Sequence, residues 1–433
     1  MAEAKFTYEI INKEKKTIRI KQAQSVTEEV VIPEKVVYYK QEYTVTEIGG
    51  YAFYETSLKS VIIPNSVTRI GGNAFLYCSN LEHVVLSDSI EGIGEGAFAG
   101  CPNVDFSGKI PSKHNGAIII NGVLIARPKG VSEYVIPDGV TRIGRSAFSD
   151  CLSLTSIIIP DSVTEIGSNA FGRTNISSIT IPASVKRIDG ALFAGCSKLI
   201  RVMVEDANTV YDSRNNCDAI IESNSNSLIS GCSSTIIPTG VASIGDGAFN
   251  SCGGLTSITI PESVKSIGKS AFSRCTNLND INIPEGITSI GDDVFFNCIR
   301  LTAIILPESV TSIGRSAFVN CSSLTSITIP ASVTSIGDEA FRFCSNLSAV
   351  YISSIESWRK ISFGNCYSKP MYDNLYLNGE LLTDLEIPAG AANKEEPISS
   401  STPVKEEAVK ATTKPSKEEP KSLFGRILGL FKK

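Results

Sequence analysis

Hydrophobic and polar positions follow one another along this chain in an order that returns every 22 or 23 residues. One copy, "LTSITIPASVTSIGDEAFRFCSN", spans 324–346, and a near copy precedes it at 301–323. The shared unit reads L-x-x-I-x-I-P-x-x-V-x-x-I-G-x-x-A-F-x-x-C-x-x. A fixed period of this length is typical of solenoids built from stacked units.

Each unit begins with a segment that predicts a short β-strand. In "LTSITIP", Ile258 and Ile260 alternate with Ser257 and Thr259, as expected of a strand with one buried face. Proline follows in most copies, and it belongs where pairing stops because it has no N–H to donate. A second, shorter extended piece, "SVTSIG", comes next.

An "IGxxAF" box completes each unit. We expect its glycine to supply a turn that a β-carbon would resist; Asp189 takes this place once, and Asp tolerates left-handed geometry. Two steps between boxes, 98 to 148 and 193 to 249, are about two periods long and therefore hold insertions. The box phenylalanines, which we place in the core, are Phe53, Phe75, Phe98, Phe148, Phe171, Phe193, Phe249, Phe272, Phe295, Phe318 and Phe341.

One unit cannot bury its own apolar face, so the units must stack. We predict a β-rich solenoid of about a dozen rungs with parallel sheets and a continuous core. The 23-residue period lies within the range of leucine-rich repeats. The units resemble those of the BspA-like leucine-rich-repeat proteins of bacteria and some protists, whose hallmark is "IPxSVTSIGxxAFxxC", over about residues 32–390. The resemblance implies a right-handed superhelix and a surface protein that binds host proteins or other cells.

Three segments predict β-hairpins. "GAIIINGVLIAR" (116–127) places two apolar runs around Asn121-Gly122, a strong turn signal, and "NCDAIIESNSNSLISGC" (216–232) has a longer polar tip. We expect both to project from the rod without interrupting the stack. The third turn is Asn378-Gly379; after it Leu382, Leu385, Ile387 and Pro388 restore the strand pattern of a last rung and cap.

The predicted organisation has four parts. They are an N-terminal cap at 1–47; the solenoid at 48–390, with insertions at about 104–134 and 205–234 and a C-terminal cap at about 347–390; a disordered linker at 391–420, rich in Lys, Glu, Pro, Ser and Thr; and an amphipathic helix at 421–433.

Most of the twelve cysteines share one position in the repeat. Three observations argue against disulfides within this column. Thr56 and Thr174 fill the position in two copies, so sulfur is not required there. An odd number of thiols cannot pair completely, and stacked side chains point the same way and not at each other. We therefore predict buried small residues. Cys217 and Cys232 are off phase and can face each other across the second hairpin, which makes them a candidate disulfide for an oxidising compartment; Cys366 is unassigned. The in-phase cysteines are Cys78, Cys101, Cys151, Cys196, Cys252, Cys275, Cys298, Cys321 and Cys344.

Composition and motifs argue against catalysis. The chain is 42% hydrophobic with a net charge of −5, which disfavours a nucleic-acid surface. "IGKSAF" resembles the end of a P-loop, but no glycine stands five positions before Gly268. The chain has only two histidines, His83 and His114, and it has no CxxC pair, so a zinc site is not expected. The acidic pair Asp292-Asp293 is most simply a solvated turn. We predict no catalytic residue, metal or cofactor.

The outward side chains of the first strands form a ladder of small, mostly uncharged residues. Solenoids bind large partners through such faces, although the same residues are also good strand formers on a plain solvated sheet. Because aromatic and Arg anchors are scarce on this ladder, the hairpins are equal candidates. The ladder positions proposed to face a partner are Ser257, Thr259, Asp280, Asn282, Ile305, Ser326 and Thr328; Ser156, Ile158, Ser178, Thr180 and Ala303 share their phase.

The chain ends in "KSLFGRILGLFKK". Wound as a helix, its apolar residues fall in one arc and its cationic residues in the other, which suits a membrane interface or a groove on a partner protein; the alternative is a tail end without a role. The docking residues would be Leu423, Phe424, Arg426, Ile427, Leu428, Leu430 and Phe431.

Location and function follow from these parts. The start has no apolar run like that of a secretory signal, and no stretch of 18 apolar residues exists. We expect a monomeric, non-enzymatic scaffold that binds a protein partner inside the cell, at the inner membrane surface through 421–433. The alternative is a secreted or cell-surface BspA-like adhesin whose leader has been removed. The weakest alternative is a carbohydrate-binding module, which predicts a cleft with paired carboxylates and clustered aromatic residues.

Overall fold

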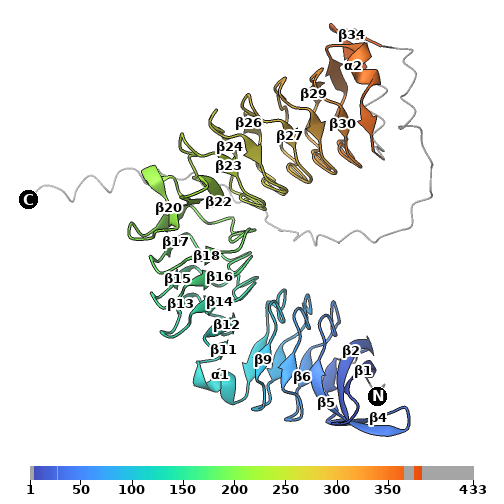
Figure 1. Ribbon diagram of the computed structural model, residues 1–433, viewed down its shortest axis with the longest axis vertical. Coiled ribbons are helices and arrows are strands. Elements are labelled where there is room, and N and C mark those ends of the chain that lie inside the picture. Colours follow the sequence, from blue (N-terminus) through green and yellow to red (C-terminus); the bar gives the residue numbers. More distant parts are fainter. Residues whose placement is uncertain (1–3, 27, 365–374, 383–433) are drawn as a thin grey trace, which may run out of the picture. The chain divides into compact units, whose positions relative to one another are not determined.

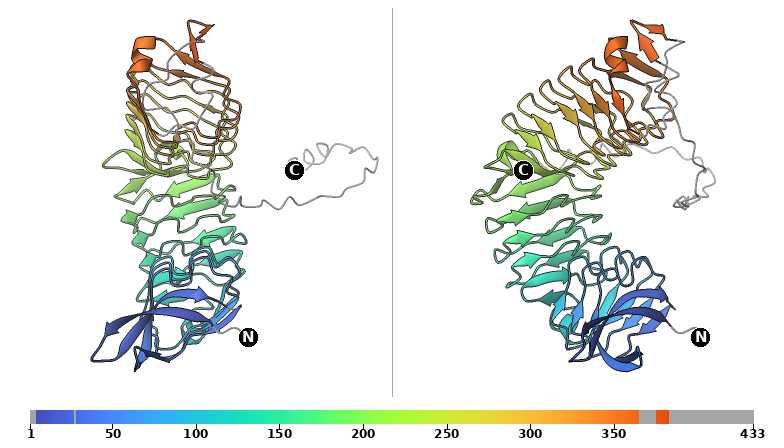
Figure 2. Two further views of the ribbon diagram at one scale, coloured as in Figure 1. Left: turned by 90° about the vertical axis from the view of Figure 1, so that its right-hand side faces the viewer. Right: turned by 45° about the vertical axis from the view of Figure 1, so that its right-hand side comes forward.

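A computed structural model describes residues 4–26, 28–364 and 375–382. These residues belong to one compact unit, Met1–Ala392, and form a parallel-sheet solenoid of about 15 turns with almost no helix. Figures 1 and 2 show the coils lying one on the next. The count exceeds the predicted dozen because strands of the caps and of the insertions also take places in the stack. The predicted linker and helix at 391–433 lie outside the described residues.

The N-terminal cap consists of two hairpins that join the first sheet. Strand β1 (Lys5–Asn12) pairs antiparallel with β2 (Thr17–Ser25), and β4 (Lys35–Tyr38) pairs antiparallel with β5 (Gln41–Ile48). Strands β2 and β5 run parallel, and β5 in turn pairs in parallel with β7 (Arg69–Ile70) of the first full coil. The cap thus gives the stack a closed end, as a solenoid requires.

The first strand of each coil alternates between buried and exposed residues, as predicted. Each such strand pairs in parallel with its equivalent one coil away: Glu133 of β13 lies opposite Ser156 of β15, and Val135 lies opposite Ile158. In Figure 1, β13, β15 and β17 lie on one side of the stack, and β14, β16 and β18 lie on another. The first strands are β3 (Glu29–Val31), β6 (Ser60–Ile62), β8 (His83–Val85), β10 (Asp105–Ser107), β13 (Glu133–Val135), β15 (Ser156–Ile158), β17 (Ser178–Ile181), β19 (Arg201–Val204), β24 (Ser257–Ile258), β26 (Asp280–Ile281), β29 (Ser326–Ile329), β31 (Ala349–Ile352) and β33 (Leu375–Leu377).

The second strands are only two residues long and pair in the same way. Ser289 lies opposite Ser312, which lies opposite Ser335, so the register advances by one whole coil at each step. These strands are β7, β9 (Gly92–Ile93), β14 (Arg142–Ile143), β16 (Glu165–Ile166), β18 (Arg187–Ile188), β23 (Ser243–Ile244), β25 (Ser266–Ile267), β27 (Ser289–Ile290), β28 (Ser312–Ile313), β30 (Ser335–Ile336) and β32 (Ser362–Phe363).

The box forms a third side of the coil, which the repeat pattern did not reveal as a paired segment. In one coil the backbone N–H groups of Ser316, Phe318 and Asn320 donate to carbonyls of the next coil, each at 2.8 Å. Ser316 and Asn320 have φ values of 54° and 57°, and left-handed residues recur at both places along the stack. Two left-handed residues around the Ala-Phe pair therefore bend the chain while its backbone groups stay paired.

The box phenylalanines lie in the core, as predicted, and the structure shows that rings of neighbouring coils stack face to face. Phe295 lies 5.8 Å from Phe272 and 5.3 Å from Phe318 between ring centroids, and all three side chains are fully buried. Within each of the three hydrophobic clusters, every coil therefore contributes one large ring to an apolar column, which holds neighbouring coils in register.

The box glycine has a different role from the one predicted. None of the box glycines has a positive φ. A Cβ on Gly94 would instead lie 2.3 Å from the backbone nitrogen of Gly72 in the preceding coil, and one on Gly314 would lie 2.6 Å from that of Asp292. The glycine is required because two backbones approach closely. Asp189 occupies this place where the ring spacing to the preceding coil, 6.2 Å, is the widest of the stacked pairs.

The two insertions form hairpins, but these do not project from the stack. Strand β11 (Ile118–Ile120) pairs antiparallel with β12 (Val123–Ala126), and β12 pairs parallel with β14. Likewise β21 (Ala219–Glu222) pairs with β22 (Ser227–Gly231), and β22 pairs with β23. Each hairpin thus takes the place of a second strand within a sheet. A helix α1 (Lys109–Lys113), a strand β20 (Tyr211–Asp212) and a 3-10 turn η1 (Arg214–Asn216) complete the insertions.

The hairpins partition the core because both of their faces are apolar. Ile118 and Ala126 pack into the hydrophobic cluster of the first coils, whereas Leu124 packs into that of the middle coils. At the second insertion, Ile220 joins the middle cluster and Ile221 joins the last one. A continuous apolar run such as "AIIINGVLIA" is the signature of strands buried on two sides, which explains why the expectation of projection was wrong.

The C-terminal cap confirms the third predicted hairpin. Strand β33 pairs antiparallel with β34 (Glu380–Leu381) across Asn378 and Gly379, both at positive φ. A short helix α2 (Ile355–Arg359), whose first turn is capped by the Ser354 hydroxyl, buries Trp358 beneath it. Leu385, Ile387 and Pro388 lie outside the described residues.

Candidate functional site

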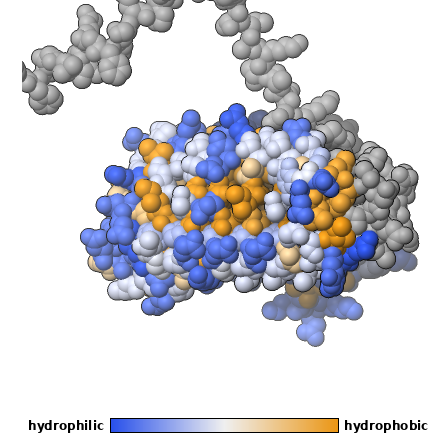
Figure 3. All heavy atoms as spheres, turned by 90° about the horizontal axis from the view of Figure 1, so that it is seen from above, coloured by the Kyte–Doolittle hydropathy of each residue, from blue (hydrophilic) through white to orange (hydrophobic). Residues whose placement is uncertain are grey.

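The predicted ladder faces outward from the first strands. Ser257 lies opposite Asp280, Thr328 lies opposite Tyr351, and Ile305 is 81% exposed. Asn282 has a structural task, since its amide donates to the carbonyl of Ile260 at 3.0 Å and accepts from the N–H of Ile260 at 2.7 Å. Seen from above, the molecule presents a band of hydrophobic residues bordered by hydrophilic ones (Figure 3). The geometry of the ladder is as predicted; its role in binding stays a prediction.

A groove along the third side of the coils is the better-formed candidate. It encloses about 410 Å³ and is lined by box-turn residues of successive coils, from Tyr51 in the first to Arg274 near the middle of the chain. Its small residues include Ala99, Gly100 and Ala191. We call it the turn groove. Sequence reasoning missed it because the strand pattern treats these positions only as connections.

Tyrosines from two coils form one wall of the turn groove. Tyr51 and Tyr77 line it with rings that are 54% and 52% exposed, and Tyr54, 43% exposed, packs between them. The Tyr54 ring centroid lies 6.0 Å from that of Tyr51 and 6.2 Å from that of Tyr77, at interplanar angles of 74° and 56°. The Asn73 amide donates to the Tyr51 hydroxyl at 2.9 Å, which fixes the wall. Aromatic residues were expected to be scarce on the ladder; on this other side of the coils they are gathered.

Arginines from three further coils supply the charge of the turn groove. Arg145, Arg173 and Arg274 line it, and Asp150 is the only carboxylate among the described residues that line it. Arg173 pairs with Asp150 at 3.3 Å, whereas Arg145 and Arg274 make no ion pair within the described residues. The charged lining is therefore three cations and one anion, on a chain whose net charge is −5.

Backbone N–H groups at three points along the turn groove are already paired with the next coil. The N–H of Tyr77 donates to the carbonyl of Ala99 at 2.9 Å, that of Arg173 to Ala194 at 2.8 Å, and that of Ser251 to Ser273 at 2.7 Å. An incoming chain therefore cannot add as another strand here. Recognition in the turn groove has to run through side chains.

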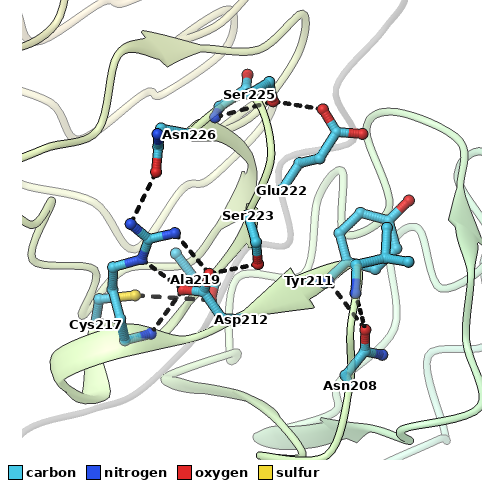
Figure 4. Close-up of polar contacts among 12 residues, drawn as sticks. Asn208, Tyr211, Asp212, Cys217, Ala219, Glu222, Ser223, Ser225 and Asn226 are labelled. Carbon is cyan, nitrogen blue, oxygen red and sulfur yellow. Dashed lines mark hydrogen bonds and ion pairs between the residues drawn. The ribbon is translucent and has the colours of Figure 1, made fainter.

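The second insertion carries a dense polar network, shown in Figure 4. The Asp212 carboxylate accepts hydrogen bonds from Nε and Nη2 of Arg214 at 2.7 and 2.6 Å and from the Ser223 hydroxyl at 2.7 Å. Burial alone would raise the pKa of Asp212, but these hydrogen bonds lower it below its ordinary value. Arg214 also donates to Asn226 at 2.9 Å. Because each of these contacts lies within the insertion, the network fixes the polar tip of the hairpin.

The in-phase cysteines are buried free thiols, as predicted, and the structure adds a reason for their position. The thiol of Cys78 donates to the carbonyl of Phe53 in the preceding coil at 2.9 Å, and Cys298 donates to Phe272 at 3.2 Å. Seven of the nine make this contact. The other two, Cys151 and Cys252, belong to the coils that directly follow an insertion.

Cys217 and Cys232 do not form the candidate disulfide in this structure. Both are buried free thiols; Cys217 donates to Ala219 at 3.7 Å and Cys232 to Asp218 at 3.3 Å. They pack into different hydrophobic clusters, on the two sides of the hairpin. Cys366 lies outside the described residues.

The predicted lack of a metal site concerns His, Cys, Asp and Glu side chains. Among the described residues, no three His, Cys, Asp or Glu side chains gather to hold a metal ion. Asp292 is engaged elsewhere: it accepts from the N–H of Arg315 at 2.9 Å and pairs with Lys269 at 3.4 Å. His83 is exposed on β8. Within the described ranges, no helix has the length and apolarity to cross a membrane.

Comparisons with known proteins agree with the repeat. The family model for the BspA type leucine rich repeat region, in six copies, matches 32–115, 127–241 and 242–369, which include every box phenylalanine. A search of curated proteins finds no match. A leucine rich cell surface protein of Faecalibacterium prausnitzii is 33% identical, with 83% of this chain and 98% of that chain covered and a TM-score of 0.55.

Two other solved structures resemble the chain less closely. The pneumococcal vaccine antigen PcpA is 19% identical, with coverage of 89% and 99% and a TM-score of 0.49. A leucine-rich repeat protein of Bacteroides ovatus is 27% identical, with coverage of 84% and 98% and a TM-score of 0.39.

Proposed function

Because the chain belongs to the BspA type leucine-rich-repeat family, we propose that it is a non-enzymatic scaffold that binds a protein partner through the outside of its solenoid. The observation that carries this proposal is the turn groove, which gathers exposed Tyr51 and Tyr77 with Arg145 and Arg173. Tyr and Arg are the residue types that dominate binding energy at protein interfaces. The exposed ladder on the first strands, by comparison, has few aromatic or Arg side chains.

A second candidate places the same scaffold outside the cell, as an adhesin. It is favoured by the 33% identity to a leucine rich cell surface protein, against the expectation of an intracellular chain. Protease added to intact cells that make the protein separates the two. Loss of the full-length chain from intact cells supports the cell-surface adhesin. Survival there, with digestion after lysis, supports the intracellular scaffold.

The segment 421–433 is proposed as the tether of the scaffold, through Leu423, Phe424, Ile427, Leu428, Leu430 and Phe431. An amphipathic cationic helix of this length binds a membrane interface weakly and reversibly. The test is co-sedimentation of the full chain, and of a chain ending at Gly390, with vesicles of neutral and of anionic lipid. The full chain should pellet with anionic vesicles and the shortened chain should not. Equal pelleting of the two chains would refute the tether.

A further inference from the structure

We propose that the turn groove binds an acidic peptide segment of a partner protein, with acidic side chains on Arg145, Arg173 and Arg274 and an apolar or aromatic side chain against Tyr51 and Tyr77. The inference rests on the proposed function and names the chemistry of the partner. It follows from the charge, the shape and the spacing of the groove.

The charge of the turn groove selects an anion. Three guanidinium groups against one carboxylate form a cationic patch on a chain whose net charge is −5, so the patch is local and not a property of the whole surface. Guanidinium groups hold carboxylates through paired hydrogen bonds, and Arg clusters recur where acidic motifs are recognised. Arg145 and Arg274 have no ion partner among the described residues, and the Arg274 guanidinium lies over the Phe296 ring at 5.9 Å, so both charges are available to an anion.

The tyrosine wall favours a peptide over an anionic polysaccharide. The three rings are tilted against one another by 56° to 74° and so form a ridged wall with no single flat platform. A ridged wall accepts a branched or aromatic side chain between rings, with the hydroxyls remaining at the solvent edge. Because the backbone N–H groups of Tyr77, Arg173 and Ser251 are paired within the solenoid, the groove holds the peptide chiefly through its own side chains.

The spacing of the coils sets the spacing of the acidic residues. Neighbouring coils lie about 4.8 Å apart, and an extended peptide advances about 3.3 Å per residue. Arg145 and Arg173 come from adjacent coils, whereas Arg274 lies at least three coils beyond Arg173, on the far side of the second insertion. A bound peptide would therefore place acidic residues together near one end and another at least about four residues away. From Tyr77 to Arg274, the six repeat steps and the two insertions between them correspond to a segment of at least about nine residues.

The test selects peptides without assuming a direction. A displayed library of random dodecapeptides is panned on the immobilised full chain, and an enriched peptide is synthesised with a fluorescent label for anisotropy titration. We expect enrichment of Asp and Glu together with an apolar or aromatic residue. Arg173→Ala and Tyr77→Ala should each weaken binding about tenfold, and raised salt should weaken it further.

A matched pair of variants separates the groove from net charge. Arg145→Glu/Arg173→Glu/Arg274→Glu and Arg69→Glu/Arg300→Glu/Arg359→Glu each change the net charge from −5 by −6, to −11. All six side chains are exposed, so both variants should fold, which circular dichroism verifies. The first should lose binding at least a hundredfold, and the second should retain it within about threefold.

Three outcomes would overturn the inference. One is enrichment without acidic residues, a second is equal loss in the two triple variants, and the third is binding of heparin at the groove with no peptide selected. A selected peptide that ignores every groove substitution would overturn the groove assignment yet leave the scaffold function standing. The scaffold function itself is tested by the cross-linking measurement that closes the Discussion.

Discussion

Replacing Gly94 by alanine should damage the stack, whereas the same change at Gly92, two residues earlier, should not. A Cβ on Gly94 would lie 2.3 Å from the Gly72 nitrogen and 2.7 Å from its Cα, where real contacts essentially never fall below 3.0 Å. Nothing lies within 4 Å of a Cβ on Gly92, and its φ is ordinary. The pair therefore isolates the close approach of two coils from the general effects of removing a glycine.

The size of the destabilisation expected for Gly94→Ala follows from the fact that the added Cβ meets backbone atoms. The neighbouring coil must retreat by about 0.7 Å, the difference between 3.0 and 2.3 Å, and no flexible side chain can absorb this shift. Overpacking of this kind costs about 1–3 kcal/mol. Gly92→Ala should instead stabilise the chain by about 0.4–1 kcal/mol, because it restricts the unfolded state.

The assay is urea unfolding of both variants, followed by circular dichroism and by fluorescence of Trp358, the only tryptophan. Coils interact chiefly with their neighbours, and Trp358 lies in the distant cap. Gly94→Ala should therefore lower the urea midpoint measured by circular dichroism more than the midpoint measured by Trp358 fluorescence. Equal midpoints for Gly94→Ala and Gly92→Ala would refute the explanation of the box glycine.

Three other predictions test the core and the insertion. Phe295→Ala should cost about 3–5 kcal/mol in unfolding free energy, because its ring is stacked on both sides, whereas Phe343→Ala at a 62% exposed position should cost under about 1 kcal/mol. Burial raises the pKa of Cys298 to about 12, so iodoacetamide at pH 8 should leave Cys298 unmodified until urea is added; rapid native labelling, read by mass spectrometry, would contradict this burial. Asp212 has a lowered pKa in the folded chain, so the stability it contributes is present above its unfolded pKa of about 3.9 and is lost as pH falls through the folded value. Asp212→Asn should flatten the fall of the urea midpoint below about pH 4, and an unchanged pH profile would contradict the assigned network.

Features of the fold that depend on local sequence could be predicted. Alternation in "SITI", proline at strand ends and the Asn121-Gly122 and Asn378-Gly379 turns were enough for the strands, the hairpins and the buried phenylalanine column. The placement of a strand that is covered on both faces was predicted wrongly. The two insertion hairpins were expected to project, although the lack of polar alternation at 118–120 already indicated burial on both sides.

The candidate site was harder to predict than the fold. Tyr51 and Tyr77 are one coil apart, and they meet Arg145 and Arg173 only because coils on the two sides of the first insertion continue along one face. That continuity depends on the parallel pairing of β12 with β14. This pairing joins two separate segments, so the sequence of either segment alone does not predict it. The ladder was predictable because its side-chain phase follows from one strand, but phase alone did not reveal that Asn282 serves the backbone of Ile260.

The central claim is that the solenoid surface binds a protein, and site-specific photo-cross-linking in intact cells tests it most directly. A photoreactive phenylalanine analogue is placed at Tyr77 in the turn groove and, in a second chain, at Ile305 on the exposed ladder. The account predicts a discrete protein adduct at Tyr77. An adduct at Ile305 alone would move the interface to the ladder, and the absence of a protein adduct at both positions would contradict the scaffold function.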